Sequence, residues 1–439
     1  MSDLHEHYFP IVIIGGGVLG NALSYALSSV YSGSDIAVIE MAHDVACHAS
    51  GRNTGVIHRP FYLHPEHKKK FALMANESFV LWKKYAKLKS LPWKEIGTLE
   101  VATSPEQRHS LDQYQQWAIK NGMEKKEIEL LSSDEVRKIE PHVHSSGALF
   151  CQTDTAVDFR LFTQSLKNDS MSQGVTFFFD SEVKHISNQN NRYSLSCDNG
   201  LRIETKYFIN CAGGGALKLA HMLGLAREFA DMHFRGDYWH IHPSFFSLAS
   251  RNIYSVPRHS AFPFLDPHWV VKHDGSVEIG PNAAPIIGPY TYSGVMGNPF
   301  SSIQNIFTGP FSNRLKLLKN KEFYSLALQE WRSSFSRRHM IRRVQAFLPE
   351  LDAHAVTKKG IGGIRSILID PLGNFVKEAL EFFTPSSLHI LNYNSPGATG
   401  APFYALSLIS QLKEKGFLEH LSLLKKKNSE TWSIQTIHL

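Results

Sequence analysis

Three glycines near the start of the chain have the type and spacing that can hold an anion at a turn. Gly15, Gly17 and Gly20 lie in the stretch "IVIIGGGVLGNALSYAL", in which an apolar run enters the glycines and a helical pattern leaves them. In the spacing G-x-G-x-x-G, the first glycine permits a tight turn, the second admits a pyrophosphate and the third lets helix and strand pack closely. The amide groups at the start of the helix would face the phosphates. This pattern predicts a dinucleotide-binding turn.

A carboxylate follows at the distance that such a turn requires. Glu40 ends the apolar stretch "IAVIE", roughly twenty residues after the turn, where it can accept hydrogen bonds from a ribose diol and would repel a 2′-phosphate. NADP is therefore disfavoured, whereas NAD and FAD both remain compatible with this unit.

The segment "HASGRNTGVIH" distinguishes between these two cofactors. It places the donor-rich side chains of Ser50, Arg52, Asn53 and Thr54 shortly after the ribose acid, where they suit a second stretch of cofactor that lies across the sheet. FAD is long enough to need such a stretch, so the sequence favours FAD.

The elements that must position these residues form a βαβ unit. Ile11 to Ile14 and Ile36 to Glu40 have the continuous apolar character of buried parallel strands, and Leu19 to Val30 is the helix between them. Further along, Asp274-Gly275 in "HWVVKHDGSVEIGPN" predicts a tight antiparallel hairpin. A Pro-Gly turn near the end of the chain predicts another helix, which begins near Ala401.

A strongly basic segment lies before this last helix. Residues 330–351 predict one amphipathic helix with several arginines, namely Arg332, Arg337, Arg338, Arg342 and Arg343. A solvated basic face is the main interpretation, and contact with a membrane surface or an acidic partner is the alternative.

The overall composition sets the class of protein. The chain has 439 residues, 43% of them hydrophobic, and can bury a large core, so a disordered or fibrous protein is excluded. The formal net charge of +6 is small for this length, and no nucleic-acid partner is expected. Four widely separated cysteines argue against a disulfide framework or a metal site and favour a reducing, cytoplasmic location. "MSDLHEHYFP" shows no signal or transit peptide, and no apolar run has transmembrane length.

Five further segments carry a resemblance to a known family. They are "GRNTGVIH" (51–58), "FRGDY" (234–238), "DGSVEIGPNA" (274–283), "GGIRSILIDPLGNFV" (362–376) and "NSPGAT" (394–399). Together with the glycine turn, they resemble the FAD-dependent oxidoreductases of the D-amino-acid oxidase type, and within these the L-2-hydroxyglutarate dehydrogenases and oxidases.

This resemblance implies an α/β fold with two discontinuous domains. A Rossmann-like FAD-binding domain would comprise residues 1–90, 145–225 and 355–425. An α+β substrate domain with a mixed or antiparallel sheet would comprise residues 91–144 and 226–354, and residues 426–439 would form a tail. Further cofactor contacts are then expected at Val183, Ala212, Gly213, Gly397, Ala398 and Thr399.

The implied reaction is the oxidation of a small carboxylate substrate, a 2-hydroxy acid such as L-2-hydroxyglutarate, to the 2-oxo acid by hydride transfer to flavin N5. A base must take the hydroxyl proton, and His58 and His268 are the candidates. Arg365 would clamp the substrate carboxylate, and Tyr238 would donate a second hydrogen bond to it. An ordinary ion pair and simple sheet packing are the structural alternatives for these two residues.

Two other arginines lie in matching segments. Arg59 begins "RPFY", a departure from the family pattern, and either pairs with a distal acidic group or is exposed. Arg235 of "FRGDY" either braces the sheet or meets the substrate.

Other functions remain open at this point. The same fold could oxidise an amine, such as glycine, sarcosine or a D-amino acid, and a flavoprotein that binds membrane or RNA through residues 330–351 belongs to another class. Oxygen, a quinone or another protein could accept the electrons, and the protein could lie at the cytoplasmic face of a membrane.

Overall fold

The first sheet of the molecule is built around the buried strand that precedes the glycine turn. The computed structural model describes residues 6–189, 192–257, 266–297, 308–424 and 432. The strands of this sheet are β1 (Glu6–Ile14), β2 (Ile36–Ile39), β9 (Thr176–Phe178), β10 (Val183–Gln189), β11 (Arg192–Cys197), β12 (Arg202–Asn210), β21 (Leu380–Phe383) and β22 (Ser387–Leu391). Strands β1, β2, β9, β12 and β22 pair in parallel, and the antiparallel hairpins β10–β11 and β21–β22 extend the sheet.

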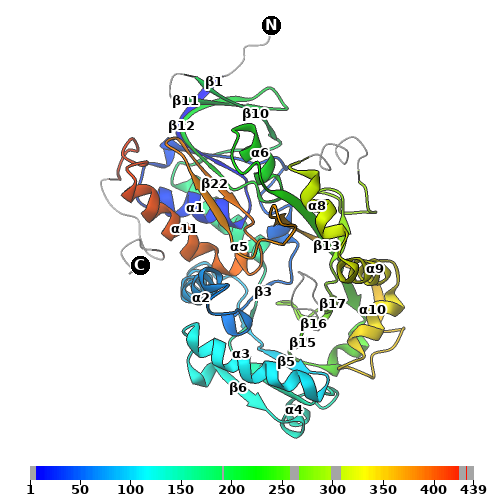
Figure 1. Ribbon diagram of the computed structural model, residues 1–439. Helices are drawn as coiled ribbons and strands as arrows, with labels where there is room; N and C mark the ends of the chain where they lie inside the picture. The colour runs from blue at the N-terminus through cyan, green and yellow to red at the C-terminus, as the bar shows by residue number, and fades with distance from the viewer. Residues whose placement is uncertain (1–5, 190–191, 258–265, 298–307, 425–431, 433–439) are drawn as a thin grey trace.

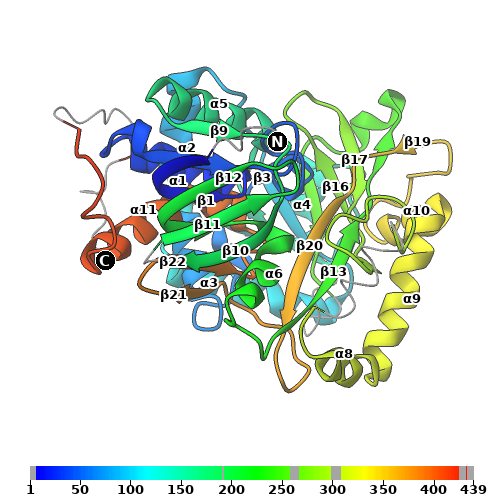
Figure 2. The same ribbon diagram turned by 90° about the horizontal axis from the view of Figure 1, so that it is seen from above.

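Strand β1 is apolar on both faces because both faces are covered. Ile11 and Ile13 pack against a layer of helices, whereas Val12 and Ile14 pack toward the β10–β11 hairpin and α6. Figures 1 and 2 show this layered arrangement. The helices are α1 (Val18–Ser28), α2 (Lys69–Lys89), α5 (Phe159–Ser172) and α11 (Gly397–Glu414) on the first side and α6 (Ala216–Met222) on the other.

A second sheet lies below the first in Figure 1 and has its own apolar core. Its order is β19-β14-β17-β16-β15-β5-β7-β6, and its strands pair antiparallel except β15 with β5. The strands are β5 (Thr98–Ala102), β6 (Ile128–Leu131), β7 (Gly147–Cys151), β14 (Trp239–Ile241), β15 (Asn252–Ser255), β16 (His268–Val271), β17 (Val277–Gly280) and β19 (Val356–Lys359). Helices α3 (Arg108–Lys120), α4 (Ser133–Ile139) and α10 (Arg337–Val344) pack with them.

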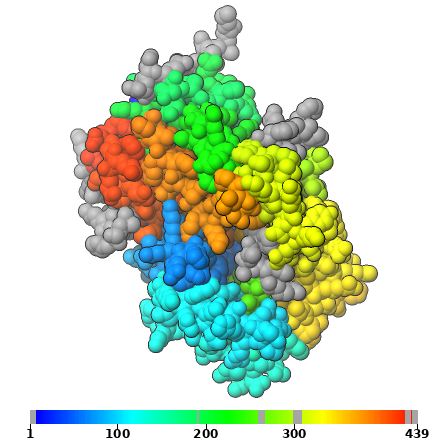
Figure 3. Space-filling model, in the orientation of Figure 1, coloured from blue at the N-terminus to red at the C-terminus, as the bar shows by residue number. Residues whose placement is uncertain are grey.

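Two small sheets complete the described fold. One contains β18 (Ala284–Ile286), β13 (Ala230–Gly236) and β20 (Gly363–Ile369), and the other β3 (Val56–Ile57), β8 (Thr155–Ala156) and β4 (Lys94–Glu95). Helices α8 (Phe311–Leu318) and α9 (Lys321–Phe335) contact the first of these, at the right of Figure 2. In the space-filling view, blue residues that include α2 lie between the orange C-terminal part and the cyan lower part (Figure 3).

The predicted α/β class with a mixed second sheet is confirmed, and several details need correction. Strands β7 and β19 lie in the second sheet, although residues 145–225 and 355–425 were assigned to the other domain. The last helix begins at Gly397 rather than near Ala401. The hairpin at Asp274-Gly275 joins β16 to β17 as predicted.

The basic segment is two helices rather than one. Ser336 leaves the helical conformation at the end of α9, and its hydroxyl caps α10 by accepting a hydrogen bond from the amide of His339. Arg343 is buried and forms ion pairs with Glu330 and Asp266, at 2.9 and 3.3 Å. The prediction that the arginines of residues 330–351 form a solvated face is therefore wrong for Arg343.

Candidate functional site

The glycine turn joins β1 to α1 and leaves the helix start open. Gly15 has a φ of +116°, and a Cβ there would lie 2.5 Å from the carbonyl oxygen of Cys211. A Cβ on Gly20 would lie 2.0 Å from the Gly15 carbonyl oxygen, so the helix could not pack as it does. Gly17, the N-cap of α1, has no side chain that could cap the helix, and the Ser50 hydroxyl accepts a hydrogen bond from the Val18 amide at the helix start. These features fit an anion held at the helix N-terminus.

Glu40 lies directly at this turn, as the sequence predicts. Its carboxylate accepts hydrogen bonds from the amides of Gly16, at 2.6 Å, and Ala42, at 2.8 Å. The side chain is almost fully buried, and this burial raises the pKa of Glu40. A buried acceptor beside the phosphate turn has the chemistry that a ribose diol requires.

The donor-rich segment packs against the same turn. Ser50 accepts a hydrogen bond from the amide of Val18, at 2.9 Å, so it contacts the first turn of α1. The Asn53 side chain makes its hydrogen bonds within its own loop. Its amide nitrogen donates to the Ser50 carbonyl, and its oxygen accepts from the Gly55 amide. The carbonyl of Thr54 accepts from Lys272. The structure thus shows this segment beside the turn.

Arg52 is held by its own surroundings. Its Nε donates to the carbonyl of Cys47 at 2.7 Å, and its guanidinium lies 4.1 Å from the ring centroid of Tyr292. Its backbone oxygen also closely approaches Gly363, where a Cβ would lie 1.9 Å from it. The Cys47 carbonyl and the Tyr292 ring therefore fix the Arg52 guanidinium before any cofactor binds.

The remaining predicted cofactor residues form two groups. Val183 packs in the core on the outer face of the first sheet, and Ala212 lies against Gly15 and is followed by Gly213 at a φ of +53°. The second group, Gly397, Ala398 and Thr399, forms the first turn of α11, which no side chain caps.

Helix α11 begins beside His58. The Thr399 hydroxyl accepts a hydrogen bond from the His58 amide at 3.2 Å, and the indole of Trp82 donates to the Thr399 carbonyl at 2.9 Å. These contacts bring the open N-terminus of α11 to the same place as a candidate catalytic residue. The helix dipole would stabilise negative charge on a reduced flavin ring bound there.

His58 has a carboxylate partner that sequence analysis did not identify. Its Nδ1 lies 3.2 Å from Oδ2 of Asp154, which is completely buried and also accepts from the Thr98 hydroxyl and the Arg59 amide. Because the ionised carboxylate only accepts, Nδ1 carries the proton and Nε2 presents a lone pair. This arrangement suits a base that takes a proton at Nε2.

His268 is a different kind of histidine. Its ring stacks on Tyr254 at a centroid distance of 3.7 Å, and its Nδ1 has no hydrogen-bond partner among the described residues. Burial, and then the charge of His58, lower the pKa of His268 to about 3. It therefore stays neutral at physiological pH and is a weak base.

Arg365 is a half-buried cation without an acid. It lies on β20 opposite Phe234 of β13, and within the described ranges no acidic group or carbonyl pairs with its guanidinium. Burial lowers its pKa, and the hydroxyl groups of Tyr238 and Tyr62 interact with it electrostatically. Tyr62 also contacts the ring of His58 at 6.0 Å, which links the cation to the histidine.

A second cation, Lys68, stands at the start of α2. Burial and then the charge of Arg365 lower the pKa of Lys68. The charge of Glu378 acts in the opposite direction on Lys68, and the nearby Lys70 is paired with Glu381. Two neighbouring positive groups favour an anionic ligand.

Arg59 and Arg235 have structural roles. Arg59 is only 4% exposed, so the interpretation as an exposed residue is wrong, and it pairs with Glu127 at 3.0 Å and stacks on Phe79. Arg235 is buried, pairs with Asp237 at 2.9 Å and donates to the Thr291 carbonyl, so it braces the sheet.

Removing the Arg59 guanidinium should mainly cost stability. We expect Arg59→Met to lower the free energy of unfolding by about 3 kcal/mol, because Glu127, whose side chain is 11% exposed, would lose its cationic partner. Urea denaturation of the protein measures this loss. Adding Glu127→Gln should recover part of it, and weaker substrate binding at unchanged stability would contradict a structural role.

Among the described residues, no three side chains of His, Cys, Asp or Glu lie close enough together to hold a metal ion. In the same parts of the chain, no helix combines the length and apolar character needed to cross a bilayer.

Comparison with known proteins gives a family. The model of the family described as FAD dependent oxidoreductase (DAO) matches residues 10–410. L-2-hydroxyglutarate dehydrogenase of Escherichia coli K12 is 29% identical over 406 residues, which cover 92% of this chain and 93% of that protein. The mitochondrial L-2-hydroxyglutarate dehydrogenase of Homo sapiens is 29% identical over 90% of this chain and 86% of its own.

Solved structures show the same fold at lower identity. L-α-glycerophosphate oxidase from Mycoplasma pneumoniae, solved with FAD bound, has a TM-score of 0.75 at 21% identity and covers 96% of this chain and 98% of its own. Glycine oxidase from Geobacillus kaustophilus has a TM-score of 0.70 at 17% identity, over 96% and 99% of the two chains. At these identities the likeness concerns the fold alone.

Proposed function

The chain belongs to the DAO family of FAD-dependent oxidoreductases, and from this premise we propose that it oxidises L-2-hydroxyglutarate to the 2-oxo acid. FAD, the cofactor of the family, supplies the hydride acceptor when bound. The observation that carries the proposal is the guanidinium of Arg365, which is unpaired among the described residues and shares the neighbour Tyr62 with the His58–Asp154 pair. Relatives similar over nearly the full chain are L-2-hydroxyglutarate dehydrogenases, which favours a hydroxy acid over an amine.

Each side chain has one task in this proposal. Arg365 holds the carboxylate next to the reacting carbon, and Tyr238, buried beside it, donates a hydrogen bond to the same group. His58 accepts the hydroxyl proton at Nε2 while Asp154 fixes its ring. The residues proposed to hold FAD are those of the two glycine turns, Glu40, the 50–54 segment, Val183 and the start of α11.

The first test is the visible spectrum of the purified protein without oxygen. We expect L-2-hydroxyglutarate to bleach the flavin absorbance in a single turnover, because a base and a carboxylate clamp are both present and no oxygen is there to reoxidise the reduced flavin. The D-enantiomer and D-alanine should leave the spectrum unchanged. Bleaching by D-alanine or glycine instead, with release of ammonia, would support the amine-oxidase alternative.

We also propose that the protein contacts an anionic membrane surface, from which a quinone accepts the electrons. Helices α8 and α9 expose apolar side chains on one face, and Phe335 is 67% exposed. Four exposed arginines without acidic partners in the described structure lie next to this face. The apolar residues are Phe311, Leu315, Leu318, Tyr324, Leu328 and Phe335, and the arginines are Arg332, Arg337, Arg338 and Arg342.

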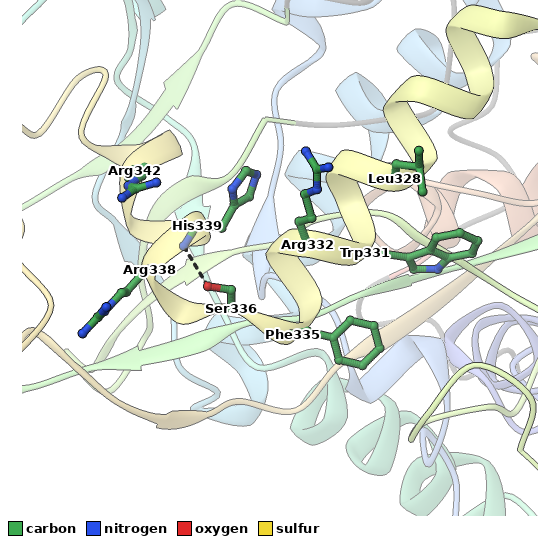
Figure 4. A pocket seen from close by; sticks show the side chains of 8 residues that line it. All are labelled: Leu328, Trp331, Arg332, Phe335, Ser336, Arg338, His339 and Arg342. Carbon is green, nitrogen blue, oxygen red and sulfur yellow. Dashed lines mark hydrogen bonds between the residues drawn. The ribbon is translucent and has the colours of Figure 1, made fainter.

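Part of this surface is a groove of about 550 Å³ (Figure 4). Leu328, Trp331 and Phe335 line it from α9, and Arg338 and Arg342 line it from α10. Apolar groups flanked by cations match the interface of a bilayer with anionic lipids. The break at Ser336 places the arginines of α10 beside the apolar end of α9.

Flotation on vesicles tests this contact. We expect the protein to float with phosphatidylglycerol-containing vesicles, and replacing Arg332, Arg338 and Arg342 by Ser should weaken binding about a hundredfold, at about 1 kcal/mol for each arginine. Arg192→Ser, on β11 of the first sheet, is the control. Equal flotation of both variants, or binding of the wild type to RNA alone, would overturn the membrane proposal.

A further inference from the structure

A row of three side chains crosses the second sheet next to His58 and Asp154. Glu100 on β5 is in register with Tyr254 on the parallel strand β15, and Tyr254 stacks on His268 of β16. Thr98 lies two residues before Glu100 and therefore on the same face of the sheet. Since the Thr98 hydroxyl donates to Asp154, this face carries the catalytic pair. The His58 ring contacts Tyr254 at a centroid distance of 5.7 Å.

The polar groups of this row lack hydrogen-bond partners in the part of the chain that the structure describes. The Tyr254 hydroxyl and Nδ1 of His268 are buried without a hydrogen bond in the described structure. Glu100 is 5% exposed, and no hydrogen bond or ion pair joins its carboxyl group to any described residue. Buried polar groups are normally paired, so an unpaired row beside a catalytic histidine points to a polar ligand.

Glu100 is surrounded by groups that favour its neutral form. Burial, and then the charges of Asp154 and Asp266, raise the pKa of Glu100 to about 8. The other titratable groups that face it are hydroxyls, from Tyr62 before α2, Tyr114 of α3 and Tyr254 of β15. Of the cations of the site, Arg365 interacts with Tyr238 and Tyr62, and Lys68 interacts with Arg365 and with the acid Glu378. At neutral pH, Glu100 is therefore a hydrogen-bond donor.

We propose that Glu100 is a specificity-determining residue that donates a hydrogen bond from its neutral carboxyl group to the distal carboxylate of the substrate. This inference rests on the proposed function, in which Arg365 holds the carboxylate next to the reacting carbon. A 2-hydroxy dicarboxylate would then bind Arg365 with one carboxylate and Glu100 with the other, and its hydroxyl group would lie at His58. A hydrogen bond from a neutral acid to a carboxylate is short and strong.

The same residue makes dicarboxylate binding dependent on pH. When Glu100 loses its proton, it loses its donor and places a negative charge beside the distal carboxylate, so the dicarboxylate is repelled. A monocarboxylate, which has only the end that binds Arg365, does not experience this repulsion. The discrimination between the two should therefore fall as the pH rises.

Calorimetric binding of non-reactive acids to the purified FAD-containing protein tests this. Glutarate should bind about ten times more weakly at pH 9 than at pH 6.5, the factor that a group with this pKa gives when only its neutral form binds. Butyrate should bind equally at both values. A glutarate affinity that does not change with pH would overturn the proposal without any variant.

Two variants sharpen the result. Glu100→Gln keeps a donor but cannot ionise, so glutarate should bind to this variant at pH 9 as tightly as it binds to the wild type at pH 6.5. Lys68→Met should weaken both acids at both pH values. If Lys68→Met instead removed the preference for glutarate, and Glu100→Gln left the pH dependence intact, Lys68 would be the distal site and the proposal would be wrong.

These outcomes are separate from the test of the proposed function. If L-2-hydroxyglutarate fails to bleach the flavin although glutarate binds with the expected pH dependence, the proposed function fails and the role of Glu100 toward dicarboxylates stands. If bleaching occurs but the pH dependence is absent, the role of Glu100 alone is refuted.

Discussion

Replacing Arg365 by Met is expected to lower kcat/KM for L-2-hydroxyglutarate by about 10²–10³-fold. This guanidinium is half-buried on β20 and has no acid partner in the described structure, so it is available to a substrate carboxylate. Removing one member of a buried charge pair costs about 2–5 kcal/mol, and the substrate also loses its orientation toward His58. Steady-state kinetics should show a raised KM together with a lowered kcat.

A matched arginine elsewhere makes this result specific. Arg332 on α9 is exposed and likewise lacks an acid partner among the described residues, but it lies at the groove between α9 and α10. Arg332→Met should leave kcat/KM within twofold of the wild type. Arg365→Lys should retain part of the activity, because an ammonium keeps the charge but loses the bidentate geometry. An Arg365→Met enzyme with less than tenfold loss would show that the carboxylate binds elsewhere.

The cofactor turn was predictable because its chemistry is local. The spacing of Gly15, Gly17 and Gly20 and the acid at Glu40 follow from the conformation of one βαβ unit, and the structure places the acid at the turn. The hairpin at Asp274-Gly275 was predictable for the same reason, since a positive φ at Gly275 depends on neighbouring residues only. Short-range rules were sufficient for these features.

The partners of the candidate catalytic residues required tertiary structure. Asp154 lies 96 residues after His58 in the chain and follows β7, and no motif in the sequence marks it. Glu100 is an acidic residue, yet the sheet buries it beside Tyr254. Arg343 was grouped with exposed arginines because charge patterning cannot reveal Glu330 and Asp266 packed around it. Long-range packing decided each of these cases.

Replacing His58 by Gln is expected to lower kcat by about 10²–10⁴-fold, with KM changed less than threefold. His58 is the histidine whose Nδ1 is held by a buried carboxylate, so that its Nε2 can take the hydroxyl proton, and loss of a positioned base has effects of this size. Single-turnover reduction of the flavin in a stopped-flow instrument measures the step directly. Substrate binding depends on Arg365, so it should persist.

The comparison with His268 decides which histidine is the base. His268 has a pKa of about 3 and stacks on Tyr254, so His268→Gln should slow flavin reduction less than tenfold. Asp154→Asn should approach the loss seen for His58→Gln, because an amide can donate to Nδ1 and stabilise the tautomer that protonates Nε2. A larger loss for His268→Gln than for His58→Gln, with Asp154→Asn nearly unaffected, would transfer the role of base to His268 and leave the His58–Asp154 pair with a structural role.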